Sequence, residues 1–217
     1  MRAVCGALLF VTLGCASTVT RLDGEFPAPI GPARGSCEQA DWLVVAPTRA
    51  QFIERTGLRA TPRDDGVAVY RVGAKRPEPI SKYADSMRPT LPSVDEHVQR
   101  ARNYDVKTWG AAGLGAAGLI AIGVGAALFA TSFKTDPVTQ NQKIEGTQAG
   151  GGAALVLVGF GLGIGGVALN PGQAERSRAE ASRYVFLPPK DTRENVVTWT
   201  QTYNQAVRDR CERAPPP

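Results

Sequence analysis

The sequence has little of the chemistry on which enzymes and metal sites depend. A single histidine, His97, and four cysteines stand among 217 residues, whereas a zinc site needs several such ligands at close spacing. A serine or cysteine nucleophile would have only His97 as its imidazole base, and no G-x-S-x-G turn is present. We therefore predict no catalytic residues, no metal and no cofactor, and rank an envelope hydrolase centred on His97 as the weakest hypothesis.

Concentrated charge is also scarce. The formal net charge of +5 comes from 25 Lys and Arg against 20 Asp and Glu, spread along the chain. No run of basic residues is interleaved with aromatic residues, as would be typical of a nucleic-acid surface. The charges therefore predict a solvated surface and no nucleic-acid partner.

Glycine and long uncharged apolar blocks are abundant. More than half of the 24 glycines lie in two blocks, and residues 108–133 and 146–174 contain no charged side chain. An apolar helix of about 20 residues is long enough to cross a hydrocarbon core. We predict transmembrane helices over 109–133 and 147–170, joined by a polar loop over 134–146, and hence both flanking regions on one side of the membrane. The predicted fold class is a membrane α-helical hairpin plus a small extracytoplasmic α+β domain.

The first block contains a possible phosphate-binding motif, because residues 113–118 fit G-x-G-x-x-G. A dinucleotide site would need a strand before this motif and an amphipathic helix after it. The preceding residues "HVQRARNYDVKTW" have the character of a helix, and the following residues are apolar on every face. Because this context does not suit a dinucleotide site, we predict no nucleotide partner.

Small residues recur instead at four-residue intervals that would place them on one helix face. Such residues let two helix backbones approach closely in a membrane. The predicted helix-packing residues are Gly113, Ala117, Ala121 and Gly125 in the first block and Gly159 and Gly163 in the second. The arrangement resembles the glycine zipper of paired bacterial membrane helices.

The chain begins with "MRAVCGALLFVTLGCAST", in which one basic residue precedes a short apolar core. This core is too short to span a bilayer and is typical of a signal peptide, predicted over residues 1–14. The stretch "VTLGC" resembles a bacterial lipobox, although Leu13 stands one place late; the resemblance implies lipidation of Cys15. The alternative is cleavage after "GCA", which would remove Cys15. Residues 15–40 are predicted to be the anchor and a Pro/Gly-rich linker.

Two topological signals conflict. The signal peptide places the polar regions outside the cytoplasm and the loop inside. The positive-inside rule favours the reverse, because basic residues flank both blocks: Arg100, Arg102, Lys107, Arg176, Arg178 and Arg183. The loop contains Lys134 and Lys143. We give precedence to the signal peptide, and the predicted location is the bacterial envelope, at the inner membrane.

The polar regions show a few structured segments. Within a small α+β region over 41–108, "DWLVVAP" (41–47) and "GVAVYRV" (66–72) predict strands, with a short helix over 50–55 between them. Ser93 and Glu96 predict a capping box that opens a helix continuous with the first apolar block.

The C-terminal region, 171–213, contains a predicted helix over 191–212, before a disordered tail at 214–217. One stripe of this helix is apolar and predicts packing on a core: Val196, Trp199, Tyr203, Val207 and Cys211. The adjacent Tyr203 and Asn204 resemble a feature of bacterial envelope proteins with two membrane helices.

Cys37 and Cys211 are the remaining cysteines after Cys15. Two cysteines on one side of a membrane in an oxidising compartment are candidates for a disulfide. So long a closure would stabilise the small domain by about 4 kcal/mol. The alternative is two free thiols.

Together these features predict a membrane-anchored envelope lipoprotein with a structural, scaffolding or assembly role. Its predicted partners are the lipid bilayer and either a second copy of the chain or another envelope protein. The alternative function is a self-associating, Gly-rich subunit of an oligomeric pore or transport complex.

Overall fold

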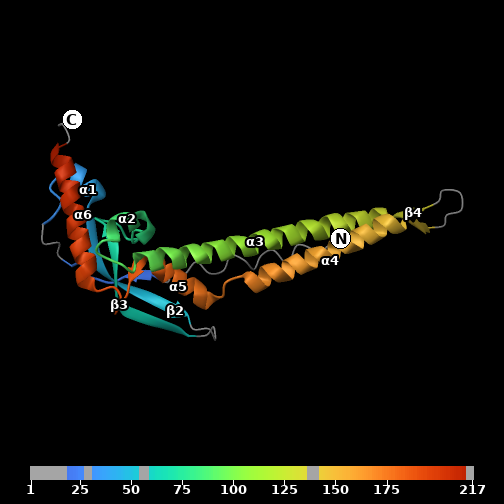
Figure 1. The fold of residues 1–217 in the computed structure, drawn as a ribbon, viewed down its shortest axis with the longest axis horizontal. Coiled ribbons are helices and arrows are strands. Elements are labelled where there is room, and N and C mark those ends of the chain that lie inside the picture. Colours follow the sequence, from blue (N-terminus) through green and yellow to red (C-terminus); the bar gives the residue numbers. More distant parts are fainter. Residues whose placement is uncertain (1–18, 27–30, 54–58, 136–141, 214–217) are drawn as a thin grey trace. The chain divides into compact units, whose positions relative to one another are not determined.

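The structure, a computed structural model, describes residues 19–26, 31–53, 59–135 and 142–213. Its contacts divide the chain into a polar unit, from residues 1–101 and 173–217, and an apolar unit, residues 102–172. The polar unit thus combines the segments that precede and follow the apolar unit in the sequence (Figure 1).

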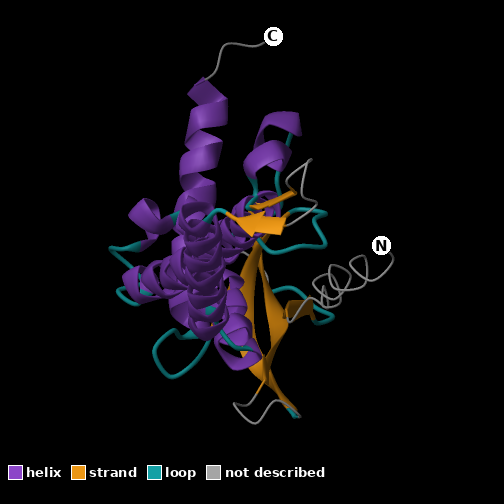
Figure 2. Ribbon diagram, turned by 90° about the vertical axis from the view of Figure 1, so that its right-hand side faces the viewer, coloured by secondary structure: helices purple, strands orange, loops and turns teal. Residues whose placement is uncertain are grey.

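The polar unit is built around a four-stranded antiparallel sheet with the order β1-β2-β3-β6 (Figure 2). The strands are β1 Val19–Arg21, β2 Leu43–Ile53, β3 Ala60–Arg71 and β6 Val185–Phe186. β6 pairs with β3 at Val67 and Ala68. Because β3 precedes the apolar helices in the sequence and β6 follows them, this pairing joins the two flanking segments in one sheet.

The long β2–β3 pair forms the centre of the sheet and corrects one prediction. Both predicted strands are present, but β2 continues to Ile53 where a helix over 50–55 was expected; residues 54 and 55 lie outside the described residues. Ala50 pairs with Arg63 and Ile53 with Ala60, after a register irregularity between Thr48 and Ala50. The local helical preference was weak, and the cross-strand pairing outweighs it.

One face of the sheet carries the main hydrophobic core. α6 (Arg193–Arg213), a 3-10 helix η1 (Ile80–Lys82), α2 (Ala84–Met87) and the start of α3 pack there. The following core residues are buried between the sheet and these helices: Leu43, Val45, Val67, Val69, Ile80, Met87, Leu91, Val94, Phe186, Val196 and Trp199. The apolar stripe of the C-terminal helix thus packs inward, with Val207 also buried.

Two further helices complete the polar unit. α1 (Ser36–Asp41) lies against α6, and α5 (Gln173–Tyr184) packs on β2. α5 was not predicted, because its sequence, QAERSRAEASRY, has no large apolar residue before its final tyrosine. Its buried side is made of small residues, namely Ser177, Ala179, Ala181 and Ser182, which present no apolar periodicity.

The apolar unit contains two long helices. α3 runs without interruption over Val94–Thr131, as the sequence predicted, and α4 spans Gly146–Leu169. β4 (Phe133–Thr135) and β5 (Gln142–Ile144) form a short antiparallel ladder between the helices, within the segment predicted to be a loop.

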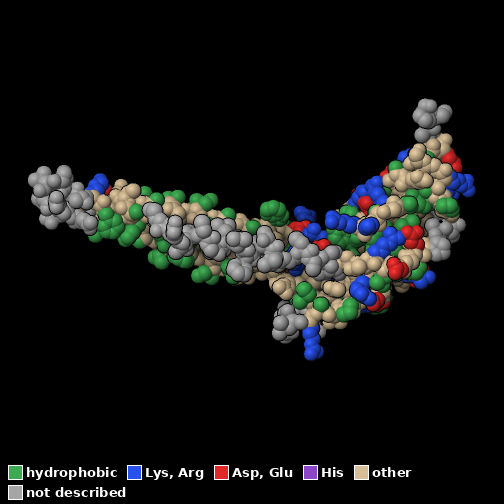
Figure 3. Space-filling model, turned by 180° about the vertical axis from the view of Figure 1, so that it is seen from behind, with side chains coloured by type: hydrophobic (Ala, Val, Ile, Leu, Met, Phe, Trp, Pro, Cys, Tyr) green, Lys and Arg blue, Asp and Glu red, His purple; other side chains and the backbone are tan. Residues whose placement is uncertain are grey.

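Both helices are long and apolar enough to cross a membrane. Only 11% of the most apolar window of α3 and 17% of that of α4 are buried within the structure. Figure 3 shows hydrophobic side chains along the described surface of this unit, whereas Lys, Arg, Asp and Glu lie mainly on the polar unit. The helices are therefore unlike the core helices of a globular domain.

Candidate functional site

The two apolar helices meet at a line of small residues. A Cβ added to Gly118 of α3 would lie 2.6 Å from the carbonyl oxygen of Gly159 in α4, and the reverse substitution would produce the same 2.6 Å contact. Gly125 and Gly152 oppose each other in the same way, at 2.6 and 2.7 Å. We call these contacts the glycine seam; they require backbone-to-backbone packing.

The seam repeats every seven residues. Gly118 and Gly125 continue back to the buried Ala111 on α3, and Gly152 and Gly159 continue to Gly166 on α4. A Cβ added to Gly166 would lie 2.9 Å from the carbonyl oxygen of Ala111. Positions seven residues apart differ by only about 20° around a helix, so this spacing keeps the small residues on the side that faces the neighbouring helix.

The four-residue stripe predicted from the sequence therefore differs from the observed line. Gly125 and Gly159 lie in the seam, but an added Cβ at Gly113 would meet nothing within 4 Å. Ala117 is exposed and Ala121 half-buried. A four-residue repeat advances about 40° at each step, since a helix turns 100° per residue, and it leaves the contact line after one or two steps.

Gly163, the last predicted packing residue, has a different environment. Its backbone nitrogen would lie 2.9 Å from a Cβ on Gly118, yet its own added Cβ would meet nothing within 4 Å. Gly163 thus borders the seam without being required by it. Gly118, Gly152 and Gly166 were missed, although their seven-residue spacing was visible in the sequence.

A polar cluster attaches the first turns of α3 to the domain. His97 Nε2 lies 2.8 Å from Asp191 Oδ2, and His97 Nδ1 lies 3.2 Å from the Ser182 carbonyl oxygen. The side chains of His97 and Asp191 are 11% and 3% exposed. Ser93 Oγ donates to the other oxygen of Asp191. His97 therefore joins α3 to the end of α5 and to the segment before α6.

This geometry determines what His97 is available to do. The Asp191 carboxylate lies between Ser93 and His97, so the arrangement is not a hydroxyl activated by an imidazole. Both ring nitrogens already face acceptors within the protein. The cluster has the contacts of a structural anchor.

The predicted capping box is not formed. Instead of bonding to the backbone of the first turn, the Ser93 hydroxyl contacts Asp191. Glu96 pairs with Lys190 and Arg100, each at 2.6 Å. Asp191 was expected to open the C-terminal helix, which in fact begins two residues later, at Arg193. Long-range partners replace the local ones in both cases.

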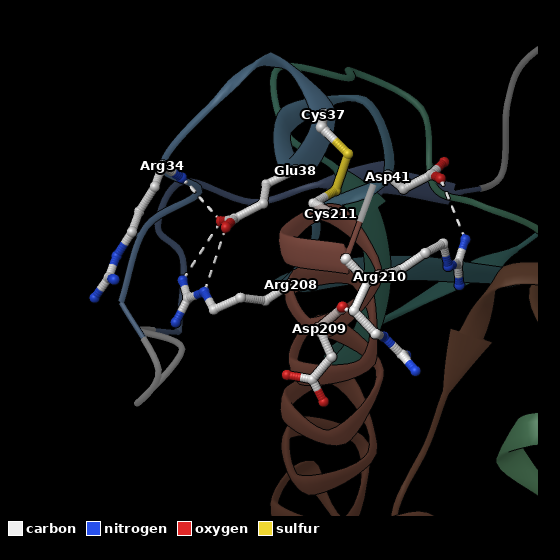
Figure 4. Close-up of a disulfide and its surroundings, with 9 residues drawn as sticks. Arg34, Cys37, Glu38, Asp41, Arg208, Asp209, Arg210 and Cys211 are labelled. Atoms are coloured by element: carbon white, nitrogen blue, oxygen red, sulfur yellow. Dashed lines mark hydrogen bonds and ion pairs between the residues drawn. A yellow bond between two sulfur atoms is a disulfide. The ribbon is translucent and has the colours of Figure 1, made fainter. Parts of the chain in front are cut away.

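The predicted disulfide is present: Cys37 and Cys211 are bonded, with their Cα atoms 6.0 Å apart (Figure 4). It connects α1 to the last turns of α6 across a sequence separation of 174 residues. The bond therefore joins the segment before the apolar helices to the end of the chain.

A buried ion pair lies beside the disulfide. Arg208 Nε is 3.4 Å from Glu38 Oε1, and the Arg34 amide donates to Glu38 Oε2 at 2.9 Å (Figure 4). The Arg34 hydrogen bond and, against the effect of burial, the Arg208 guanidinium hold the pKa of Glu38 below its ordinary value. The Arg208 guanidinium also stacks over Trp42 at 5.0 Å. These contacts pack α1 against α6, and no spacing in the sequence indicated them.

Asn204 connects α6 to the sheet. It is fully buried; its Oδ1 accepts from the Leu43 amide at 3.0 Å and its Nδ2 donates to the Leu43 carbonyl at 2.7 Å. The amide side chain thus acts as an extra strand residue where β1 does not reach β2. The sequence resemblance singled out Tyr203 and Asn204 without indicating this role.

Cys15, the predicted lipidation site, lies outside the described residues. At the far end of the hairpin, Lys134 is paired with Glu145 at 2.5 Å. Within the described part of the chain, no group of three or more His, Cys, Asp or Glu side chains is placed to hold a metal ion.

Comparison of the chain with protein-family models, with curated proteins and with solved structures finds no significant match.

Proposed function

We propose that this protein is a membrane-anchored bacterial envelope lipoprotein with a structural, scaffolding or assembly role and no catalytic activity. The observation that carries the proposal is the surface of α3 and α4, where large apolar side chains face outward: Leu119, Ile120, Leu157, Phe160, Ile164 and Val167 are each more than half exposed. In water this surface would favour aggregation. In a bilayer it is the expected lipid-facing surface.

Two further features support insertion of the hairpin. The close glycine seam is the type of contact by which helices associate in lipid, where packing replaces the hydrophobic effect. Trp109, at the start of the apolar stretch, is 78% exposed. Tryptophan is enriched at the membrane–water interface, so this position suits the boundary of the hydrocarbon core.

The disulfide supports the extracytoplasmic placement of the polar domain. Structural disulfides persist in oxidising compartments and are rare in the bacterial cytoplasm. The bond between Cys37 and Cys211 therefore agrees with the topology implied by the signal peptide rather than with the positive-inside rule. On this basis the domain faces the periplasm, the connection predicted over 134–146 faces the cytoplasm, and lipidated Cys15 adds a second anchor at the inner membrane.

The use of the polar residues supports a scaffolding role. The cluster around His97, the Glu38–Arg208 pair and Asn204 all hold elements of the domain together. Because these polar groups are used for contacts within the domain, the domain would act through its surface toward another envelope protein.

Site-directed thiol labelling tests the proposed placement. A Thr139→Cys variant and a Thr202→Cys variant, whose position is exposed on α6, are treated in intact spheroplasts with a membrane-impermeant maleimide. We expect labelling at position 202 from outside, and at position 139 only after lysis. Labelling at 139 in intact spheroplasts would overturn the proposed topology, and loss of the protein to an alkaline wash of the membranes would overturn insertion.

A second candidate function is a self-associating subunit of an oligomeric pore or transport complex. The specific observation in its favour is that Gly113, Gly123, Gly150 and Gly161 have open space where a Cβ would stand. Small residues exposed to lipid are available for further helix contacts. Counting the subunits per complex in native membranes separates a ring from a scaffold of one or two copies.

A further inference from the structure

An apolar groove of about 370 Å³ lies along one side of the α3–α4 pair. Its floor is formed by glycines of both helices: Gly115, Gly118, Gly159 and Gly163. Gly118 and Gly159 belong to the glycine seam as well, so the groove is the open side of an interface already present in the fold.

The backbones of Gly115 and Gly163 border the seam, but their side-chain positions point away from it. A Cβ added at either position would meet nothing within 4 Å. The α3–α4 contact leaves space for a Cβ at both positions, yet the sequence has glycine at both. The absent side chains leave a recess that the chain does not fill itself, and the backbone that lines it loses dispersion contacts.

Bulky apolar side chains border the recess. Leu119 of α3 is 71% exposed, and Phe160, Ile164 and Val167 of α4 also line the groove with more than half of their surface exposed. One face of the hairpin therefore carries both a recess and the ridges that could fill an identical recess. This self-complementarity is the requirement for an isologous two-fold interface.

We propose that this groove is the docking surface for a second copy of the same chain. The inference rests on the proposed insertion of the hairpin in a membrane. Two copies inserted with the same topology are related by a two-fold axis along the membrane normal, and such a rotation preserves depth. Leu119 of one copy therefore stands at the level of Gly118 in the other, where the recess lies.

Helix packing favours a second copy over lipid as the occupant. Acyl chains are flexible and are ordered at an entropic cost when they fill a fixed recess. A preformed ridge on a rigid helix fills it without that cost, and close approach across glycines is how membrane helices associate. The groove has no charged lining residue, so two copies meet without burying a charge.

The experiment uses full-length protein in phosphatidylcholine/phosphatidylglycerol vesicles. Donor- and acceptor-labelled populations, with the fluorophores on an exposed Thr202→Cys, report association through energy transfer as the protein-to-lipid ratio is varied. Gly163→Leu fills the groove. Gly161→Leu is the matched control, because position 161 lies on the same helix outside the groove and an added Cβ there also meets nothing within 4 Å.

We expect the wild type and Gly161→Leu to associate alike, and Gly163→Leu to associate about tenfold more weakly, as expected for overpacking of a fitted contact. Gly115→Leu should reproduce the effect from the opposite wall. Wild-type protein that is monomeric at every ratio, as it would be with lipid in the groove, overturns the inference, and so does equal weakening by Gly161→Leu and Gly163→Leu. Wild-type protein released from the vesicles by an alkaline wash overturns the proposed insertion itself, which distinguishes the two failures.

Discussion

Gly118 and Gly159 pack backbone against backbone across the hairpin, each so close that a Cβ on either would lie 2.6 Å from the carbonyl oxygen of the other. The contact is reciprocal and is repeated one heptad away by Gly125 and Gly152. A single methyl group at any of these positions cannot be accommodated without moving a backbone. The separation of α3 and α4 is therefore set by the absence of side chains.

The first prediction concerns Gly118→Val. Its side chain would collide with Gly159 and force the helices apart, at a cost of about 1–3 kcal/mol in the packing of the pair. Spin labels at the exposed positions Ile120 and Gly161, measured by pulsed electron resonance in vesicles, should show a longer and broader distance distribution than in the wild-type background.

Gly113→Val is the control for this experiment, because position 113 is on the same helix with open space around it. Its distance distribution should match that of the wild type. If Gly113→Val and Gly118→Val gave the same distribution, the seam would not lie where the structure places it.

The second prediction concerns the Cys37–Cys211 bond. By the loop-entropy relation, a closure of 174 residues destabilises the unfolded state by about 4–5 kcal/mol, and the effects of removing a native disulfide range from about 2 to 5 kcal/mol. The double variant Cys37→Ser/Cys211→Ser should melt at a clearly lower temperature than the wild type. A reductant should lower the melting temperature of the wild type but not that of the double variant. Alkylation of both thiols in the untreated wild type would contradict the bond.

These two features show what the sequence could and could not predict. The long α3 and the two apolar helices were visible because an uncharged run of that length has few other structures available. The disulfide could be predicted because only two cysteines remained beyond Cys15. The predicted packing line differed from the observed seam because the many glycines form both a four-residue and a seven-residue repeat. Only the position of the neighbouring helix decides which repeat makes the contact.

The polar domain was harder to predict for a different reason. α5 buries Ser177 and Ala181 rather than large apolar residues, so no periodic signal marks it. Asp191 had an assigned local role at a helix start, yet its partners in the fold, His97 and Ser93, are far away in sequence. Sequence patterns record local preferences, and these residues are used for long-range contacts.

The third prediction is a pH dependence that arises from Glu78. Burial raises the pKa of this carboxyl, but the Lys82 hydrogen bond at 2.6 Å and the charges of Lys82 and Arg71 outweigh burial, and the pKa lies below its ordinary value of 4.5. A lowered folded-state pKa stabilises the domain above the unfolded-state pKa, and that stability is lost as the pH falls through the folded-state value.

Glu78→Gln removes this charge. The variant should be less stable than the wild type at pH 7, by about 1 kcal/mol because both partners are partly exposed. The difference should narrow at an acidic pH well below 4.5, where protonation removes the same charge from the wild type. Urea unfolding of the two proteins at both pH values measures it, with the exposed Glu212→Gln as a control that stays close to the wild type. A difference that does not change with pH would rule out the ion pairs as its source.

The last prediction concerns Asn204, whose side chain satisfies both the amide and the carbonyl of Leu43 inside the core. Asn204→Leu keeps the branching at Cγ with bulkier methyl groups, and it leaves two buried backbone groups without partners, each at a cost of about 1–3 kcal/mol. The variant should unfold at a markedly lower urea concentration, and the Leu43 amide should exchange with deuterium faster than the other amides of β2. Asn195→Leu places the same change on an exposed position of α6 and should be nearly neutral. If the two variants were equally stable, the paired contact with Leu43 would contribute nothing, and the docking of α6 on the sheet would depend on Val196, Trp199 and Val207 alone.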